Sequence, residues 1–308
     1  MSVTGLASSY VSVSALRPHS QSTSEGGAVP PQGAPTTPPT PGDTITVATF
    51  NCENVFLGPP DPGHDAHDQP PKPEAALAAV GRVLQNTRAD VVAVQEVHDK
   101  KALDALVDKY MTGNPYPYRV IVPGNDSRGI NVAILSKYPI VDVHSNVGET
   151  FDVNGRKQHF SRDFLEATVR VKDGFDFTIG TTHLKAQAGG QAADDKRLGE
   201  GKEIHKILTE RMAAYPGRRY VVCGDFNDVE SSPAVRAVKG HDGDAARLYD
   251  PLAGSSEISH PATHRRIDFL LLSDGMKDAY IEGSEHVVND PDAAKGSDHL
   301  PVVAQFRV

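Results

Sequence analysis

Short β-rich runs alternate with helical stretches from residue 44 to the end of the chain, and this rhythm restricts the fold more than any other feature. Residues 45–50 alternate polar and apolar side chains, as a half-buried strand does. The next element is a helix with one apolar face at helical spacing, formed by Leu77, Val80, Val83 and Leu84. We predict further strands and two further helices, the strands at residues 90–97, 119–122, 131–135, 165–171, 175–184, 220–223, 267–272 and 302–306, the helices at 101–110 and 194–215. By itself this alternation favours a doubly wound parallel sheet.

The first 43 residues have a different composition from the rest of the 308-residue chain. They are rich in Ser, Thr, Gly and Pro, and residues 30–41 contain six prolines, so this segment cannot bury enough apolar surface to offset ordering. We therefore predict a disordered tail at residues 1–43 and one domain at 44–308. Arg17 follows the mildly apolar residues 10–16 instead of preceding them, which does not fit a secretory signal. Cytoplasm is the default expectation, with secretion left open.

The charge and the apolar runs exclude several classes of protein. The chain has 31 Lys and Arg against 40 Asp and Glu, a net charge of -9, which is not that of a basic nucleic-acid coat. No apolar run approaches the roughly 20 residues that cross a bilayer, so no membrane span is expected. Cys52 and Cys223 are too few for a disulfide framework and are expected to be buried free thiols. We expect a monomer.

Polar side chains that carry chemistry stand just past the ends of the predicted strands. Turns at strand ends gather groups from distant parts of a chain into one cleft, so the functional site is expected there. The segments are Thr49 to Asn54, Val94 to Val97, Thr181 to Lys185, Gly224 to Asp228, Arg266 to Phe269, and Gly296 to Pro301.

These segments, in this order, resemble the endonuclease/exonuclease/phosphatase superfamily, with the bacterial nuclease-like members as the nearest branch. The combination of Gly224-Asp225-Phe226-Asn227 with Ser297-Asp298-His299 carries the resemblance, and the strand with Gln95-Glu96 supports it. The resemblance implies a four-layer α/β sandwich, in which two mixed β-sheets lie face to face with helices on the outside. It also implies that residues 44–308 are a catalytic domain with a divalent-metal phosphoesterase site.

By the family pattern, Glu96 is the principal ligand of Mg²⁺, with Mn²⁺ as a substitute. A carboxylate that ends an apolar strand must be paired or hold a cation, and Mg²⁺ prefers hard oxygen donors. The resemblance adds Asn51, which helps to order the metal or substrate oxygens, and Asp298, on the metal side. Whether one or two metals bind is left open.

The resemblance assigns the catalytic roles to five residues. Asp225 orients and deprotonates the attacking water, and Asn227 binds a phosphoryl oxygen. In an extended segment residues i and i+2 point to the same side, so these two side chains can face one phosphate. Asp268 orients His299, and His183 is a second phosphate-facing histidine. These parts predict an in-line attack on a metal-bound phosphoryl group, in which both imidazoles add positive charge.

Other polar residues are weaker candidates. Lys185, Asn131, Arg162 and Arg128 are expected to contact substrate at the edge of the cleft. The cluster formed by His64, Asp65, His67 and Asp68 has the residue types for a second metal, although the surrounding prolines favour a solvated loop.

The substrate is predicted less sharply than the chemistry. The bacterial nuclease-like resemblance favours a phosphodiesterase acting on DNA or RNA, and the absence of tryptophan disfavours abasic-site repair. After the tail's -1, residues 44–308 carry -8, which argues against strong nonspecific duplex binding unless a local patch such as Arg265-Arg266 or Lys196-Arg197 compensates. Two alternatives stay open, a phosphatase or phosphodiesterase acting on a small metabolite or lipid headgroup, and a binding module without activity.

Overall fold

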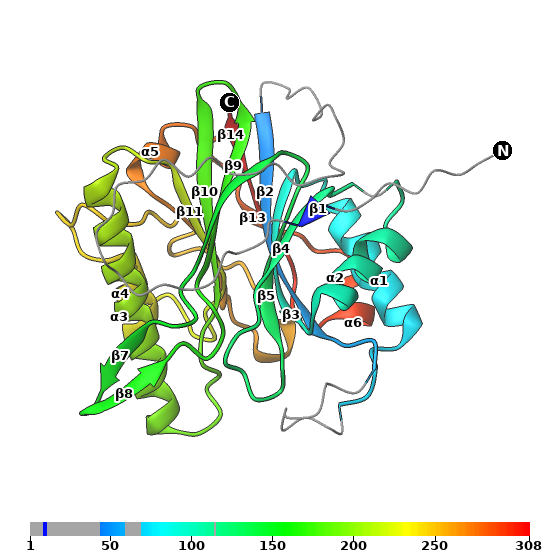
Figure 1. The fold of residues 1–308 in the computed structure, drawn as a ribbon, viewed down its shortest axis with the longest axis horizontal. Coiled ribbons are helices and arrows are strands. Elements are labelled where there is room, and N and C mark those ends of the chain that lie inside the picture. The colour runs from blue at the N-terminus through cyan, green and yellow to red at the C-terminus, as the bar shows by residue number, and fades with distance from the viewer. Residues whose placement is uncertain (1–8, 11–43, 59–68, 114) are drawn as a thin grey trace.

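Two mixed sheets form the centre of the computed structural model, which describes residues 9–10, 44–58, 69–113 and 115–308 (Figure 1). The first sheet contains, from edge to edge, β1 (Ser9–Tyr10), β4 (Tyr118–Ile121), β5 (Asn131–Ser136), β3 (Val91–Val97), β2 (Thr44–Val55), β14 (Val302–Arg307) and β13 (His286–Val287). The second contains β12 (Asp268–Leu272), β11 (Tyr220–Asp225), β10 (Phe175–His183), β9 (Leu165–Lys172) and β6 (Ile140–Ser145). A separate hairpin pairs β7 (Thr150–Val153) with β8 (Arg156–His159).

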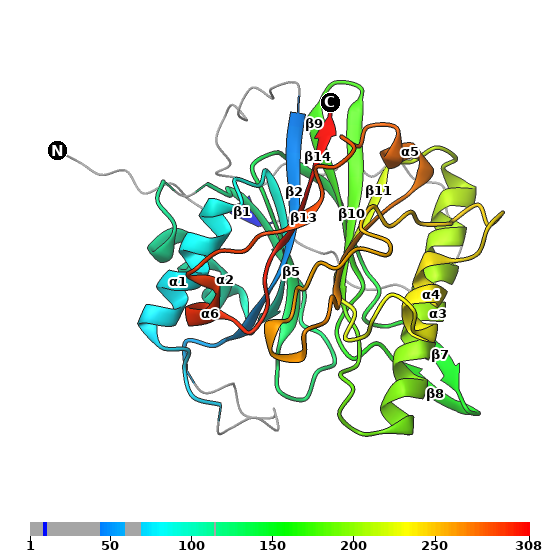
Figure 2. The same cartoon turned by 180° about the vertical axis from the view of Figure 1, so that it is seen from behind.

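Helices cover the outer face of each sheet (Figures 1 and 2). The first sheet is flanked by α1 (Glu74–Asn86), α2 (Lys100–Tyr110) and α6 (Ala293–Gly296), and the second by α3 (Gln191–Ala214) and α4 (Pro233–Lys239). The short α5 (Asp274–Lys277) precedes the strand β13, and a 3-10 turn spans Pro261–Thr263. The fold is therefore a four-layer α/β sandwich, as the family resemblance implied.

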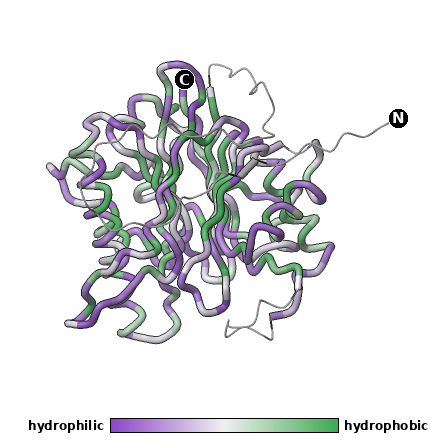
Figure 3. The backbone as a smooth tube through the Cα atoms, in the orientation of Figure 1, coloured by the Kyte–Doolittle hydropathy of each residue, from purple (hydrophilic) through white to green (hydrophobic). Residues whose placement is uncertain are grey.

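Three apolar cores separate the four layers, and Figure 3 shows the apolar residues concentrated along the central strands. Alternate residues of a strand face opposite sides of its sheet. In β2, for example, Ile45 and Val47 belong to the core between the sheets, whereas Ala48 and Phe50 pack toward α1 and α2. The third core lies between the second sheet and α3. Because the central strands are covered on both faces, most of their residues are buried.

The doubly wound sheet favoured by periodicity alone is not what forms. Each large sheet has one parallel pair at its centre, β2 with β3 and β10 with β11, and most of the other pairs are antiparallel. The predicted strands and helices are all present, with β2 extending to Val55 and α3 beginning at Gln191. The elements that were not predicted are β6, the polar hairpin β7–β8, the seven-residue α4 and the very short β1, α5, β13 and α6, none of which has a long apolar period.

Some expectations concern residues that the structure does not describe. Ser9 and Tyr10 form the short strand β1 beside β4, while the other residues of the tail and the cluster at residues 64–68 lie outside the described residues. The disordered tail therefore stays a prediction. Cys52 and Cys223 are buried and free, as expected, and burial raises the pKa of both thiols, that of Cys223 to about 12. Within the described residues, no helix combines the length and apolar character that crossing a bilayer needs.

Gly224 is the position where the fold most clearly requires glycine. Its φ is +139°, and a Cβ placed there would lie 2.0 Å from the carbonyl oxygen of Thr182 on the neighbouring strand. We expect Gly224→Ala to lower the free energy of unfolding by at least about 2 kcal/mol, because both the backbone conformation and the contact become unfavourable. Urea unfolding measures this, with Gly58→Ala as the control, since a Cβ at Gly58 meets no atom of the described residues within 4 Å. Equal stability of the two variants would contradict this explanation.

Candidate active site

The strand register brings the predicted residues to one end of the sandwich. In the parallel pair β2–β3, Asn51 lies opposite Gln95, and in the pair β10–β11, His183 lies opposite Asp225. Parallel strands present their carboxyl ends at the same edge of a sheet, so these turns meet. Asp268 begins the antiparallel strand β12 opposite Asp225, which places it at the same end.

Two irregularities in the first sheet aim side chains into this site. The pairing of β2 with β3 shifts between Asn51 and Val55, and β3 shifts against β5 between Val94 and Val97. Glu96 lies in the second shift with a φ of 63°, which is uncommon for a residue other than glycine. Bulges of this kind re-aim side chains next to active sites, and here the bulge turns Glu96 out of the regular strand pattern.

Asn51 connects the two sheets at the centre of the site. Its Nδ2 donates to Asp225 Oδ2 at 3.0 Å and to Glu96 Oε1 at 3.4 Å, although these residues are 174 and 45 positions away in the chain. Beneath it, Gln95 Nε2 donates to Thr49 Oγ1 and to Thr181 Oγ1, each at 3.1 Å. Buried polar groups need such partners, so this network fixes the spacing of the two sheets below the site.

His299 is held by a buried carboxylate. Its Nδ1 lies 2.8 Å from Asp268 Oδ2, which also accepts a 2.7 Å hydrogen bond from Ser259 Oγ. The Nε2 of His299 is 3.7 Å from Asp225 Oδ2. Burial by itself lowers the pKa of His299, but the Asp268 and Asp225 carboxylates outweigh burial and hold that pKa above its ordinary value. These two carboxylates therefore favour the protonated form of His299.

His183 has the opposite electrostatic character. Its Nε2 lies 3.4 Å from Asp225 Oδ2 and 3.9 Å from Glu96 Oε1, while its buried Nδ1 has no hydrogen-bond partner among the described residues. Burial, followed by the positive charges of Arg162, His299 and Arg128, lowers the pKa of His183 well below its ordinary value. Burial therefore disfavours the charged form of His183 that the expectation of two cationic imidazoles assumed.

Asp225 is fully buried and lies between the two histidines. Burial raises the pKa of this carboxyl, while neighbouring His299 opposes the shift. In the sequence analysis the extended strand was assumed to continue through Asn227, but it does not. The φ of Asn227 is 53°, and its backbone N–H donates to Asp225 Oδ1 at 2.8 Å. Its side-chain Nδ2 donates to the carbonyl oxygen of Leu184 at 3.0 Å. A turn, and not a shared strand face, sets the relation of Asp225 to Asn227.

The residues around Glu96 fit a hard divalent cation. Glu96 Oε2 accepts the backbone N–H of Asn54 at 2.9 Å, and the side-chain Oδ1 of Asn54 is buried without a hydrogen-bond donor among the described residues. Burial, then the nearby charges of Asp298 and Glu96, raises the pKa of Glu53. Several oxygens, crowded negative charge and an unpartnered amide oxygen are the donor set that suits Mg²⁺.

Asp298 lies on the exposed side of this cluster, and a residue missed by the sequence analysis lies beside it. The Nε2 of His260 is 3.5 Å from Asp298 Oδ2, and its ring packs edge-on against His299 with the centroids 4.7 Å apart. His260 Nδ1 accepts from the Thr263 N–H at 3.3 Å. In the sequence, His260 stands in a Ser-His-Pro turn ahead of a predicted strand and not past a strand end, where most of the other site residues stand, so its position gave no signal.

The residues predicted to contact substrate differ in how exposed they are and in which partners they already have. Arg162 is buried, donates to the Leu184 carbonyl and pairs with Asp126 at 2.8 Å. Lys185 is half-buried, with its backbone N–H bound to Glu200. Asn131 braces a loop, because its Oδ1 accepts from the Gly124 N–H and its Nδ2 donates to two backbone carbonyls.

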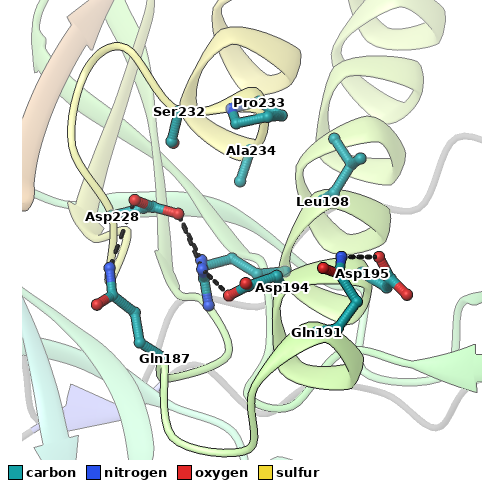
Figure 4. Close-up of a pocket in the computed structure, with 10 residues that line it drawn as sticks. Gln187, Gln191, Asp194, Asp195, Leu198, Asp228, Ser232, Pro233 and Ala234 are labelled. Atoms are coloured by element: carbon teal, nitrogen blue, oxygen red, sulfur yellow. Dashed lines mark hydrogen bonds and ion pairs between the residues drawn. The ribbon is translucent and has the colours of Figure 1, made fainter.

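One arginine of each basic patch is buried and paired, whereas Lys196 and the exposed Arg265 make no ion pair with any described residue. Arg197 is 3% exposed and pairs with Asp194 and Asp228, and Arg266 makes a two-pronged pair with Asp250. A cavity of about 500 Å³ lies beside Arg197, between the beginnings of α3 and α4, and contains none of the catalytic candidates (Figure 4). The chemistry is assigned to the side-chain cluster and not to this cavity.

Comparison with known proteins identifies the family of the chain. The model of the Endonuclease/Exonuclease/phosphatase family matches residues 48–299, and the chain belongs to this family. The family includes metal-dependent phosphoesterases, nucleases, phosphatases and sphingomyelinases, which places the chain among phosphoesterase-type hydrolases. A search of curated proteins finds no significant match.

Solved structures of similar fold include three from different organisms. The catalytic domain of human Nocturnin with a bound sulfate has a TM-score of 0.62 at 18% identity, over 86% of this chain and 94% of that one. An endonuclease/exonuclease/phosphatase from Beutenbergia cavernae has a TM-score of 0.62 at 18% identity, over 86% and 72%. Sphingomyelinase C from Streptomyces griseocarneus has a TM-score of 0.54 at 19% identity, over 86% and 99%.

Proposed function

We propose that this protein is a Mg²⁺-dependent phosphodiesterase that hydrolyses DNA or RNA, with Mn²⁺ able to replace Mg²⁺. The observation that supports this most is the position of the Asn51 amide between Glu96 and Asp225, with both catalytic imidazoles beside the same aspartate. Glu96 would hold the metal, with help from Asn51 and Asp298. When bound, the metal acts as a Lewis acid that polarises a phosphoryl oxygen.

Asp225 is proposed to orient the attacking water and take its proton. An efficient general base has a pKa near the working pH, and burial moves the pKa of Asp225 upward in that direction. The backbone N–H of Asn227 and the amide of Asn51 hold the carboxylate in one orientation. Attack in line with the leaving oxygen then needs no covalent intermediate.

The two histidines are proposed to divide the stabilisation of the transition state. His299, oriented by Asp268 and cationic, stabilises negative charge that grows on the phosphoryl oxygens. His183 is neutral and donates its Nε2–H without adding charge. Environments that push the pKa values of two such groups apart are typical of a site with two distinct roles.

Substrate phosphates outside the scissile bond are proposed to bind Lys185 and Arg162, with Asn227 on a phosphoryl oxygen. Asn131 would act indirectly, by holding the loop at Gly124. A monomer contains every residue in this scheme.

One observation favours a second candidate, hydrolysis of a small phosphorylated metabolite or a lipid headgroup by the same residues. The fold is also that of the Streptomyces sphingomyelinase, and the net charge of the domain does not by itself favour a polyanion.

A substrate panel separates the two candidates. The protein is incubated with a single-stranded oligonucleotide, a choline phosphodiester lipid and a phosphomonoester, each with Mg²⁺ and with excess chelator. We expect cleavage of the oligonucleotide with Mg²⁺ and at least a 100-fold loss with chelator, because the metal supplies several kcal/mol of transition-state stabilisation. Faster turnover of the lipid or the monoester, or full activity with chelator, would contradict the proposal.

A further inference from the structure

The hairpin β7–β8 protrudes beside the first turns of α3 but is firmly attached (Figures 1 and 2). Its turn residues Asn154 and Gly155 both have positive φ, 53° and 76°, which suits a tight two-residue hairpin turn. Phe151 packs edge-on against Phe160, and Gly199 of α3 leaves room for the Val153 and Phe151 side chains. The hairpin is therefore a rigid extension of the second sheet's helical layer.

The exposed cations of this hairpin lie on both of its faces, because Arg156 and Lys157 are successive residues of β8 and the exposed Asp152 lies opposite Lys157. Arg156, Lys157 and His159 of β8 are exposed, and neither Arg156 nor Lys157 makes an ion pair with any described residue. The nearby carboxylates are engaged in holding the turn: Asp152 accepts from the Gly155 N–H, and Asp195 accepts from Asn154 Nδ2 at 2.7 Å. Asp195 also accepts from Gln191, a hydrogen bond drawn in Figure 4.

A row of cations connects the hairpin with the catalytic cluster. Arg156 and Lys196 line the same groove, of about 320 Å³, between the hairpin and α3. Burial lowers the pKa of Lys196, the carboxylate of Glu200 opposes this shift, and the nearby charges of Lys185 and Arg162 add to it. Arg162 in turn acts on His183. Cationic side chains therefore continue from Arg162 through Lys185 and Lys196 to Arg156 of the hairpin, although Asp195 also lines the groove. They do so on a domain whose net charge is -8.

We propose that the β7–β8 hairpin and the first turns of α3 bind the phosphates of a nucleic-acid strand whose scissile bond lies at the catalytic cluster. This inference rests on the proposed phosphodiesterase function and names its substrate as a polymer. A small phosphodiester fills the catalytic cluster alone, whereas a strand carries one phosphate per nucleotide and reaches several cations in a row. Such contacts bind without reading sequence, because they neutralise backbone phosphates.

The test compares the double variant Arg156→Ala/Lys157→Ala with the unchanged protein on a 30-nucleotide single strand and on bis(p-nitrophenyl) phosphate. We expect the ratio of kcat/KM for the strand to that for the small diester to fall about 10-fold, mainly through KM. The salt dependence of strand binding should weaken by about 1.4 in log–log slope, since two phosphate contacts are lost at roughly 0.7 each. Lys172→Ala/Lys277→Ala is the matched control and should keep the ratio, because it removes two exposed cations at the other end of the second sheet from His183 and Asp268.

Three outcomes would overturn the inference. The first is an unchanged ratio, and the second is an equal loss of the ratio in the control variant. The third is that the hairpin variant binds vesicles of anionic phospholipid more weakly than the unchanged protein does but binds the strand equally well. Anisotropy with a labelled, uncleavable phosphorothioate strand in chelator measures binding without turnover. If that strand binds through the hairpin but no strand is cleaved, the proposed function fails while the binding surface stands. If strands are cleaved and the hairpin variant binds them as the unchanged protein does, the proposed binding surface is contradicted while the proposed function stands.

Discussion

Asp225→Asn is expected to lower turnover on the order of 1,000-fold, the usual loss when a general base is removed. The amide keeps the shape of the side chain and can still accept the Asn227 N–H, but it cannot take a proton from water. Burial disfavours the ionised carboxylate in the folded protein, so a neutral side chain should leave the free energy of unfolding unchanged or higher.

Steady-state kinetics with Mg²⁺ and urea unfolding of the same preparation check both halves of this expectation. Asp173→Asn, in the exposed turn between β9 and β10, is the matched control and should keep full activity. A folded Asp225→Asn protein that turns over at the unchanged rate would remove Asp225 from the catalytic role.

Glu96→Gln is expected to lower turnover by about 100-fold or more at low metal concentration, with partial recovery as Mg²⁺ is raised. The amide can still accept the N–H of Asn54, so the bulge in β3 should persist, but the negative charge that attracts the cation is gone. The readout is activity as a function of Mg²⁺ concentration, with the exposed Glu282→Gln as the control. Identical metal curves for the two variants would show that Glu96 does not hold the metal.

The strands and the larger helices could be predicted from the sequence because each is long and buries a regular apolar face. The pairing of these strands could not, since periodicity reports how one element is buried and not which neighbour it meets. Residues 45–50 look the same in a doubly wound sheet as in β2, where both faces are covered by different cores. The family resemblance supplied the second sheet, and the structure confirms it.

In the candidate site too, some features could be predicted from the sequence and others could not. The segments at Asn51, Glu96, His183, Asp225, Asp268 and His299 are predicted from residue type at strand ends, and they do converge. The local backbone was not predictable: Glu96 and Asn227 adopt positive φ because of a bulge and a turn, which no apolar period encodes.

His260 and the burial of Arg197 and Arg266 were also beyond the sequence. An isolated histidine in a turn gives no hint that it packs on His299, and a pair of basic residues reads as an exposed patch whether or not acidic partners from distant segments cover it.

The central claim, that these separate segments build one divalent-metal phosphoesterase site, is tested most directly by titrating metal-free protein with Mn²⁺ and following free Mn²⁺ by electron paramagnetic resonance. We predict saturable binding to the unchanged protein, retained binding to Asp225→Asn, and binding at least 10-fold weaker to Glu96→Gln. Absence of saturable binding to the unchanged protein, or equal affinity of Glu96→Gln, would contradict the account.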